Sequence, residues 1–75
     1  MIDFLDLFDP DKLHAVYFTY KGVRYIFSGW WMLDWDGGDK IYESIEEFLN
    51  DPFFDGKKIT EIAEEVEDID YELWP

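Results

Sequence analysis

The sequence predicts an α+β domain. In this domain a small antiparallel sheet, either a hairpin or a three- to four-stranded meander, packs against a C-terminal amphipathic helix, with a shorter helix before it. Three observations predict this fold. Two runs rich in β-branched and aromatic residues are separated by only two residues. A Ser-x-x-Glu pattern follows them and is typical of a helix start. Beyond Lys57, apolar residues recur at helical spacing. We expect residues 1–75 to form one domain.

The composition explains how so short and acidic a chain folds. It has 19 Asp and Glu against 6 Lys and Arg, a net charge of −13, yet 48% of its residues are hydrophobic and 21% are aromatic. Acidic chains usually bury too little apolar surface to fold, but aromatic rings supply the missing area. Because dense like charge destabilises the compact state, the acids indicate a function, and we expect a strongly positive partner. The negative sign argues against binding nucleic acid or an anionic membrane directly.

Cysteine usage and hydropathy bear on location. The chain has no cysteine, and no apolar run approaches the roughly 18 residues that span a bilayer. The N-terminal residues lack the basic flank of a signal peptide. We therefore expect a cytoplasmic protein without disulfides, and the sequence suggests no cofactor.

The first half of the chain predicts a short helical turn and then the hairpin. Apolar residues from Ile2 to Phe8 favour one or two turns, which Pro10 ends. The runs 14–20 and 23–27 then pair through the loop Lys21-Gly22. On the core face the expected register pairs Tyr20 with Val23, Phe18 with Tyr25, and Val16 with Phe27.

The middle of the chain allows two interpretations. Trp30 to Trp35 reads as a third strand, residues 36–39 as a turn, and Lys40 to Tyr42 as a short return strand. A single long, bulged second strand fits almost as well. After this region, Ser44 and Glu47 form a capping box for a helix that Pro52 stops.

The last segment carries the main helical pattern. Its apolar residues fall on one stripe, and the tail from Asp70 to Pro75 adds an edge strand or lies against the sheet. The stripe consists of Ile59, Ile62, Ala63, Val66 and Ile69. Combined with the hairpin, this pattern predicts a core that contains Phe18, Tyr25, Phe27, Ile59, Ile62 and Val66.

A helix in this register places four acids, Glu61, Glu64, Glu65 and Asp68, on one exposed face. They would span about 10 Å, close to one charge per phosphate step of roughly 3.4 Å along a DNA strand. An ordinary solvated face is the alternative. Such a face mixes both signs, however, and no Lys or Arg follows Lys58.

A second acidic group extends from the predicted turn into the short helix. Its members are Asp34, Asp36, Asp39, Glu43, Glu46 and Glu47. A calcium loop of the EF-hand type that starts at Asp34 fails, because Gly38 stands at position 5, Asp39 at position 6 and Ile45 at position 12. Solvated acids in a turn are the better interpretation.

The tryptophans offer a different kind of site, and catalysis has little support. Trp30 and Trp31 would point to opposite faces of a strand, so at least one is expected at the surface. With Trp35, they fit core packing, a protein-binding anchor or a sugar platform. His14 is the one histidine, and Ser44 is explained as a helix cap. We expect no enzyme activity.

In size, charge and lack of cysteine, the whole chain resembles the small acidic DNA mimics of phages and mobile elements. This class includes uracil-DNA glycosylase inhibitors, anti-restriction proteins and anti-CRISPR proteins. The segment FFDGKKITEIAEEVEDI also looks like parts of short phage-type proteins. The resemblance implies an inhibitor whose two acidic groups occupy the cationic nucleic-acid groove of a defence or DNA-processing enzyme, first a CRISPR nuclease. It carries over no individual site residue. The alternatives are a non-enzymatic adaptor that binds through exposed tryptophans and a carbohydrate-binding platform.

Overall fold

The predicted hairpin forms the centre of the sheet. A computed structural model describes residues 3–74, so Ile2 and Pro75 lie outside the described residues. Strands β1 (Leu13–Tyr20) and β2 (Val23–Ser28) pair in the expected register, including Phe18 with Tyr25. Lys21 and Gly22 both have positive φ, of 50° and 79°. This conformation defines a two-residue turn whose twist matches that of the flanking strands.

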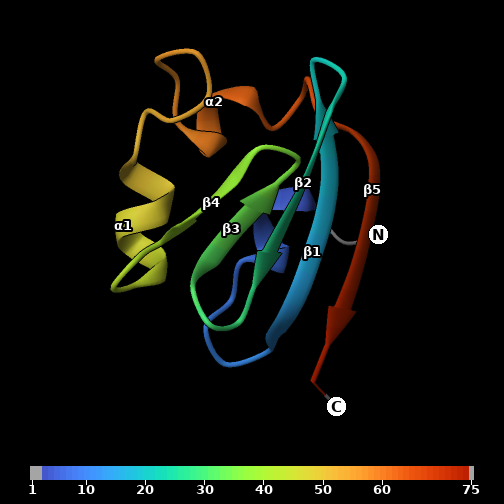
Figure 1. Cartoon of the computed structure of the whole chain (residues 1–75). Helices are drawn as coiled ribbons and strands as arrows, with labels where there is room; N and C mark the ends of the chain where they lie inside the picture. Colours follow the sequence, from blue (N-terminus) through green and yellow to red (C-terminus); the bar gives the residue numbers. More distant parts are fainter. Residues whose placement is uncertain (1–2, 75) are drawn as a thin grey trace.

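Three further antiparallel strands complete the sheet, in the order β4-β3-β2-β1-β5 (Figure 1). Strand β3 (Met32–Trp35) starts two residues later than expected, and β4 (Gly38–Ile41) starts two residues earlier. The turn between them is therefore only Asp36-Gly37, with Gly37 at a φ of 132°. The alternative of one long, bulged second strand is wrong.

The predicted fold class is also wrong at the C-terminus. The expected amphipathic helix is a single turn, α2 (Ile59–Ile62), and the chain then enters β5 (Glu67–Leu73), which pairs with β1 at the edge of the sheet. The protein is thus a mostly β, five-stranded antiparallel sheet with only short helices. The tail does form an edge strand, but this strand begins three residues before Asp70.

Two physical effects favour the strand over the helix. From Asp68 to Leu73, acids and apolar residues alternate with period two, which suits a half-exposed strand. A continued helix would also place Glu61 beside Glu65 and Glu64 beside Asp68, and like charges at i, i+4 destabilise a helix. Pairing with β1 selects the strand over the helix, because tertiary contacts outweigh a local helical pattern.

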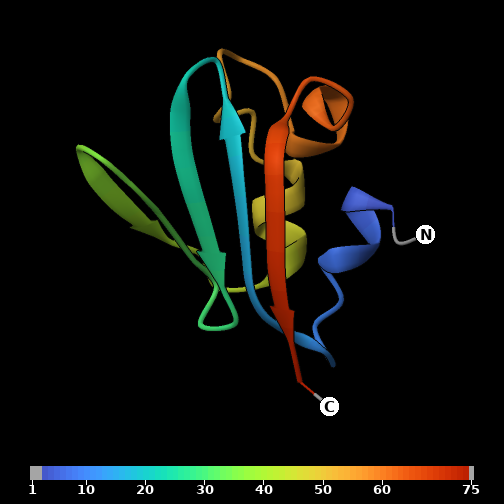
Figure 2. The same cartoon turned by 90° about the vertical axis from the view of Figure 1, so that its right-hand side faces the viewer.

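The helical segments all lie on one side of the sheet (Figure 2). They are η1 (Phe4–Leu7), a 3₁₀ turn, then α1 (Ile45–Asn50) and α2. The capping role of Ser44 is confirmed, because its hydroxyl accepts a hydrogen bond from the Glu47 amide at 3.1 Å. Asp51 follows α1 in an extended conformation, as expected before Pro52.

Aromatic rings dominate the core between the sheet and the helical segments. Phe48 of α1 is fully buried and stacks on Phe27 of β2, with ring centroids 4.0 Å apart. Of the six predicted core residues, Phe18, Phe27, Ile59 and Ile62 are fully buried. Tyr25 and Val66 are partly buried and pack against this cluster.

The stacked pair yields a stability prediction. We expect Phe48→Ala to lower the free energy of unfolding by about 3–5 kcal/mol, because it removes a buried ring and leaves a cavity. Phe48→Leu fills much of that space and should cost far less. Ile41→Ala, at a side chain that is 73% exposed, should change stability by under about 0.5 kcal/mol. Urea unfolding measures all three. Equal losses for Phe48→Ala and Ile41→Ala would contradict the assigned core.

Candidate functional site

The face of the sheet that points away from the helical segments carries acids at both margins. This outer face is the front of the sheet in Figure 1. One row of paired residues crosses it from edge to edge. The row runs Asp70, Tyr17, Ile26, Asp34 and Asp39, from β5 to β4. Four strand spacings separate its ends, about 19 Å at roughly 4.8 Å each.

The neighbouring row has one acidic end and an apolar middle. It runs Glu72, Ala15, Ser28, Met32 and Ile41. Ile26 and Ile41 are exposed, and Met32 is half-buried. The outer face therefore presents an apolar centre between acidic margins.

The segment that runs from α2 through β5 is the most acidic part of the molecule. We call its seven carboxylates the acidic edge: Glu61, Glu64, Glu65, Glu67, Asp68, Asp70 and Glu72. All seven residues are exposed. In the part of the chain that the structure describes, no acidic-edge carboxylate forms an ion pair with Lys or Arg, and only His14 lies near one, 3.5 Å from Glu72. The acidic edge is thus uncompensated charge.

The predicted helical stripe of four acids does not form. Glu61 accepts a hydrogen bond from the Lys58 amide at 2.9 Å and so caps α2. Glu64 and Glu65 lie in the turn beyond α2, and Asp68 lies in β5 with a φ of 52°. The stripe needed residues 59–69 to be one helix. Of the four acids, only Asp68 lies in β5 with Glu67, Asp70 and Glu72, while the other three precede this strand in the chain.

The second predicted group is divided between two elements. Asp34 and Asp39 face each other across β3 and β4, and Asp36 lies in the turn between these strands. Glu46 and Glu47 occupy the first turn of α1, where negative charge suits the helix dipole. Glu43 lies between the two elements and is exposed. The group therefore forms no single acidic stripe.

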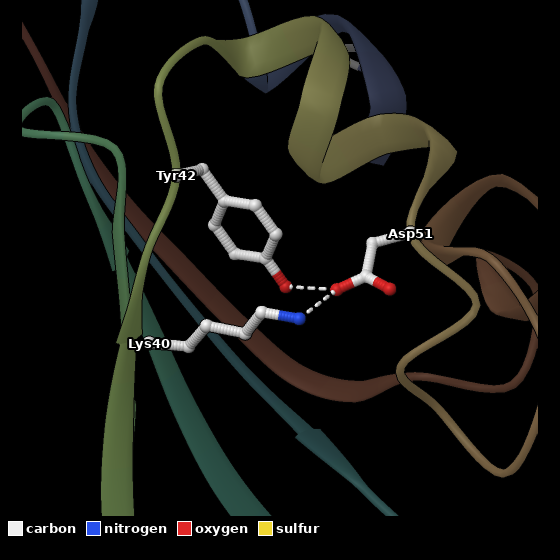
Figure 3. A network of polar contacts seen from close by, with 3 residues as sticks. All are labelled: Lys40, Tyr42 and Asp51. Atoms are coloured by element: carbon white, nitrogen blue, oxygen red, sulfur yellow. Dashed lines mark hydrogen bonds and ion pairs between the residues drawn. The ribbon is translucent and has the colours of Figure 1, made fainter.

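A polar network anchors the β3–β4 hairpin to the end of α1 (Figure 3). The Tyr42 hydroxyl donates to Asp51 Oδ2 at 2.6 Å, and Lys40 Nζ donates to the same oxygen at 2.7 Å. The Lys40 contact, followed by the Tyr42 contact, lowers the pKa of Asp51. Burial, followed by the contact with Asp51, raises the pKa of Tyr42. Lys40 thus neutralises a carboxylate outside the acidic edge.

The basic residues near the acidic edge contact other groups. Arg24 reaches from β2 across β1, where it donates to Thr19 Oγ1 at 3.1 Å and to the backbone carbonyl of Asp68 at 2.5 Å. Lys21 pairs with Asp55 at 2.8 Å. Arg24 therefore fixes the backbone of β5 and leaves the Asp68 carboxylate unpaired.

An aromatic cleft lies where the outer face meets the β2–β3 turn. His14, Gly29, Trp30 and Trp74 line a space of about 150 Å³. Trp30 is 83% exposed and Trp74 is 58% exposed. The His14 ring packs edge-on against Trp74, with centroids 4.4 Å apart. Trp74 is held there by its amide, which donates to the Lys12 carbonyl at 2.8 Å.

The β2–β3 turn explains why Trp30 is exposed. Trp31 adopts a φ of 60°, which is costly for a bulky residue, and stacks on Phe27 in the core. A β-carbon on Gly29 would lie 2.7 Å from the Leu13 carbonyl oxygen, so glycine is needed for this close approach. The expectation that at least one of Trp30 and Trp31 is exposed is confirmed, but the prediction that both lie in a strand is wrong, because they lie in the turn before β3. Trp35 packs on Phe53.

Several other observations bear on function. Within residues 3–74, no three His, Cys, Asp or Glu side chains are grouped to hold a metal ion, and no helix is long and apolar enough to cross a membrane. No family model, curated protein or solved structure matches the chain. The acidic edge and the aromatic cleft are therefore the two candidate binding features of the molecule.

Sequence reasoning missed part of both features. It did not single out Glu67, Asp70 and Glu72, although the alternation of acids with Ile69, Tyr71 and Leu73 gave the signal. It placed His14 at a strand start and Trp74 in a tail. Nothing local in the sequence indicates that these two rings meet.

The polar network generates a pH prediction. Because the folded state holds the pKa of Asp51 below its unfolded value of about 3.9, Asp51 stabilises the protein above that pH. The contribution is lost as the pH falls through the folded pKa. We expect Asp51→Asn to cost about 1 kcal/mol at pH 7, mostly through Tyr42, since Lys40 is 45% exposed. The cost measured by urea unfolding should decrease as the pH is lowered from 7 to 2.5. An equal cost at both pH values would contradict a stabilising role for the ionised Asp51 carboxylate. Asp36→Asn is the control.

The acidic edge generates a salt prediction. Uncompensated carboxylates repel one another, and salt screens them over a Debye length of about 10 Å at 0.1 M. Raising NaCl from 0.02 to 0.5 M should therefore raise Tm by about 4 °C or more. A triple variant, Glu64→Gln, Glu65→Gln and Asp70→Asn, should respond less. A wild-type Tm that falls with salt would mean that these acids are locally paired.

Proposed function

We propose that this protein is a cytoplasmic, non-enzymatic inhibitor that binds the cationic nucleic-acid groove of a defence or DNA-processing enzyme. The observation that carries the proposal is the acidic edge, with seven exposed carboxylates between residues 61 and 72 and no Lys or Arg paired with any of them in the described chain. Self-repulsion of this kind is costly unless a cationic partner relieves it. The composition of the small acidic DNA mimics supports the same class of partner.

Part of the acidic edge lies on strand β5 and not on a helix, and this changes how mimicry of DNA would work. Side chains on one face of β5 repeat about every 6.8 Å, roughly two phosphate steps along a DNA strand. Along one face of β5 the acidic edge therefore carries about half the linear charge density of a DNA strand, and it does not match the position of each phosphate. A long cationic channel tolerates this difference, because it binds the backbone mainly through its charge. A CRISPR nuclease has such a channel and is our first target class.

A second candidate function is an adaptor that binds a partner through exposed aromatic side chains. The observation in its favour is Trp30, which is 83% exposed although it follows a strand that leads into the core. Tryptophan is enriched among residues that dominate binding energy at interfaces. In this case the acidic edge would increase the association rate and contribute little to affinity.

Displacement of DNA tests the proposal. Labelled DNA is bound to each member of a panel comprising a CRISPR nuclease, a restriction endonuclease and a uracil-DNA glycosylase, and the protein is titrated in. We expect displacement from at least one enzyme. The Glu64→Gln, Glu65→Gln, Asp70→Asn variant should need about tenfold more protein, because it lacks three charges of the acidic edge.

The matched control removes the same charge from Glu43 and the first turn of α1, and α1 lies away from β5 in Figure 1. It is Glu43→Gln, Glu46→Gln, Glu47→Gln, and it should displace DNA within about twofold of wild type. Displacement from none of the enzymes, or equal loss for both triple variants, contradicts the proposal. If only Trp30→Ala abolishes binding, the adaptor function takes its place.

A further inference from the structure

We propose that the aromatic cleft binds one arginine side chain of the protein partner, as a specific anchor beside the acidic edge. The inference rests on the proposed function in one respect, because it takes from it that the partner is a protein with a cationic surface. It assigns a separate role to Trp30, Trp74 and Glu72. The acidic edge supplies long-range attraction, and the cleft supplies a position where one guanidinium is recognised.

The size of the cleft selects a single side chain. Its volume is about 150 Å³, and a cavity of about 150 Å³ holds a ligand the size of benzene. Cofactors and drug-sized molecules use pockets of roughly 300–1,000 Å³. A guanidinium has four non-hydrogen atoms, so it fits together with part of its aliphatic stem.

The lining matches the chemistry of a guanidinium. Trp30 and Trp74 offer indole rings, and arginine stacks on indole faces through its flat cation. Glu72 lies beside His14, which lines the cleft, and its carboxylate can accept two parallel N–H bonds. His14 Nε2 is 3.5 Å from Glu72 Oε2, too long for a strong hydrogen bond. Glu72 therefore retains acceptor capacity for a partner.

Charge complementarity favours arginine over an uncharged sugar. The net charge of −13 attracts cations to every part of the surface. Asp70 and Glu72 of the acidic edge lie on the outer face, and Glu72 contacts His14 of the cleft. The His14 and Trp74 rings meet edge to face, at 69°, so these two rings do not form the flat platform on which a sugar ring stacks.

The backbone on both sides of the cleft is held in place. The close approach of Gly29 to Leu13 and the Trp31 backbone fix the turn that carries Trp30. The hydrogen bond from Trp74 to Lys12 fixes the other wall. A preorganised site loses less conformational entropy on binding, which suits recognition of one side chain.

A titration followed by NMR tests the inference without the partner enzyme. The probes are the capped peptides acetyl-Gly-Arg-Gly-amide and acetyl-Gly-Lys-Gly-amide, and methyl glucoside, each added to ¹⁵N-labelled protein at 0.1 M NaCl. We expect saturable shifts of the Trp30 and Trp74 indole N–H signals and the Gly29 amide, with the arginine peptide at least fivefold tighter than the lysine peptide. Trp30→Ala and Glu72→Gln should each weaken arginine binding at least fivefold. Ile41→Ala and Glu46→Gln should leave it unchanged.

Three results would overturn the inference. They are equal shifts from the lysine and arginine peptides, arginine-induced shifts spread evenly over the acidic residues, and shifts from methyl glucoside alone. The titration also separates this inference from the proposed function. If arginine binds in the cleft but DNA is not displaced, the arginine site is supported and the inhibitor function is contradicted. If DNA is displaced but arginine does not bind in the cleft, the inhibitor function is supported and the arginine site is contradicted.

Discussion

The pairing of β5 with β1 is the contact on which the rest of the structure depends. Without it, β1 would be an edge strand, open to pairing with other chains. With it, β1 lies between two neighbours, and its Val16 and Phe18 are fully buried. The pairing has register shifts near His14 and Asp68, and Arg24 fixes the second by its bond to the Asp68 carbonyl. A highly charged edge strand also discourages further strand addition.

This pairing creates both candidate binding features. It places the β5 part of the acidic edge along one margin of the sheet, and it brings Trp74 against His14 near the start of β1. The first feature is electrostatic, acts at a distance and weakens with salt. The second is a small structured cleft that acts only on contact. Attraction over long range and recognition at one point are complementary, so both can serve one cationic partner.

The aromatic core explains how the molecule tolerates its charge. Seven phenylalanines, five tyrosines and four tryptophans stand in 75 residues, and many of the rings form one connected cluster under the sheet. Large rings bury much apolar area per residue. The acids can therefore remain at the surface without basic partners, which a less aromatic chain of this length would not tolerate.

Local patterns were enough to predict the hairpin register and the Ser44 cap, because each depends on residues adjacent in sequence. Phe18 opposite Tyr25 follows from the two-residue loop alone. The C-terminal segment could not be predicted in this way. Ile59, Ile62 and Val66 fit a helix, while Ile69, Tyr71 and Leu73 fit a strand, and the free edge of β1 decides between them. The sequence therefore predicted an exposed acidic site in this segment, but not the arrangement of its carboxylates in space.

The most direct test of this account is the backbone conformation of residues 67–73 in solution, measured by NMR secondary chemical shifts and interstrand NOEs. The account predicts strand shifts over Glu67–Leu73 and NOEs between Tyr17 and Asp70, which are paired in the structure. Helical shifts that continue from Ile59 through Ile69, without NOEs to β1, would contradict it. Such a result would remove the acidic edge of the sheet and the aromatic cleft together.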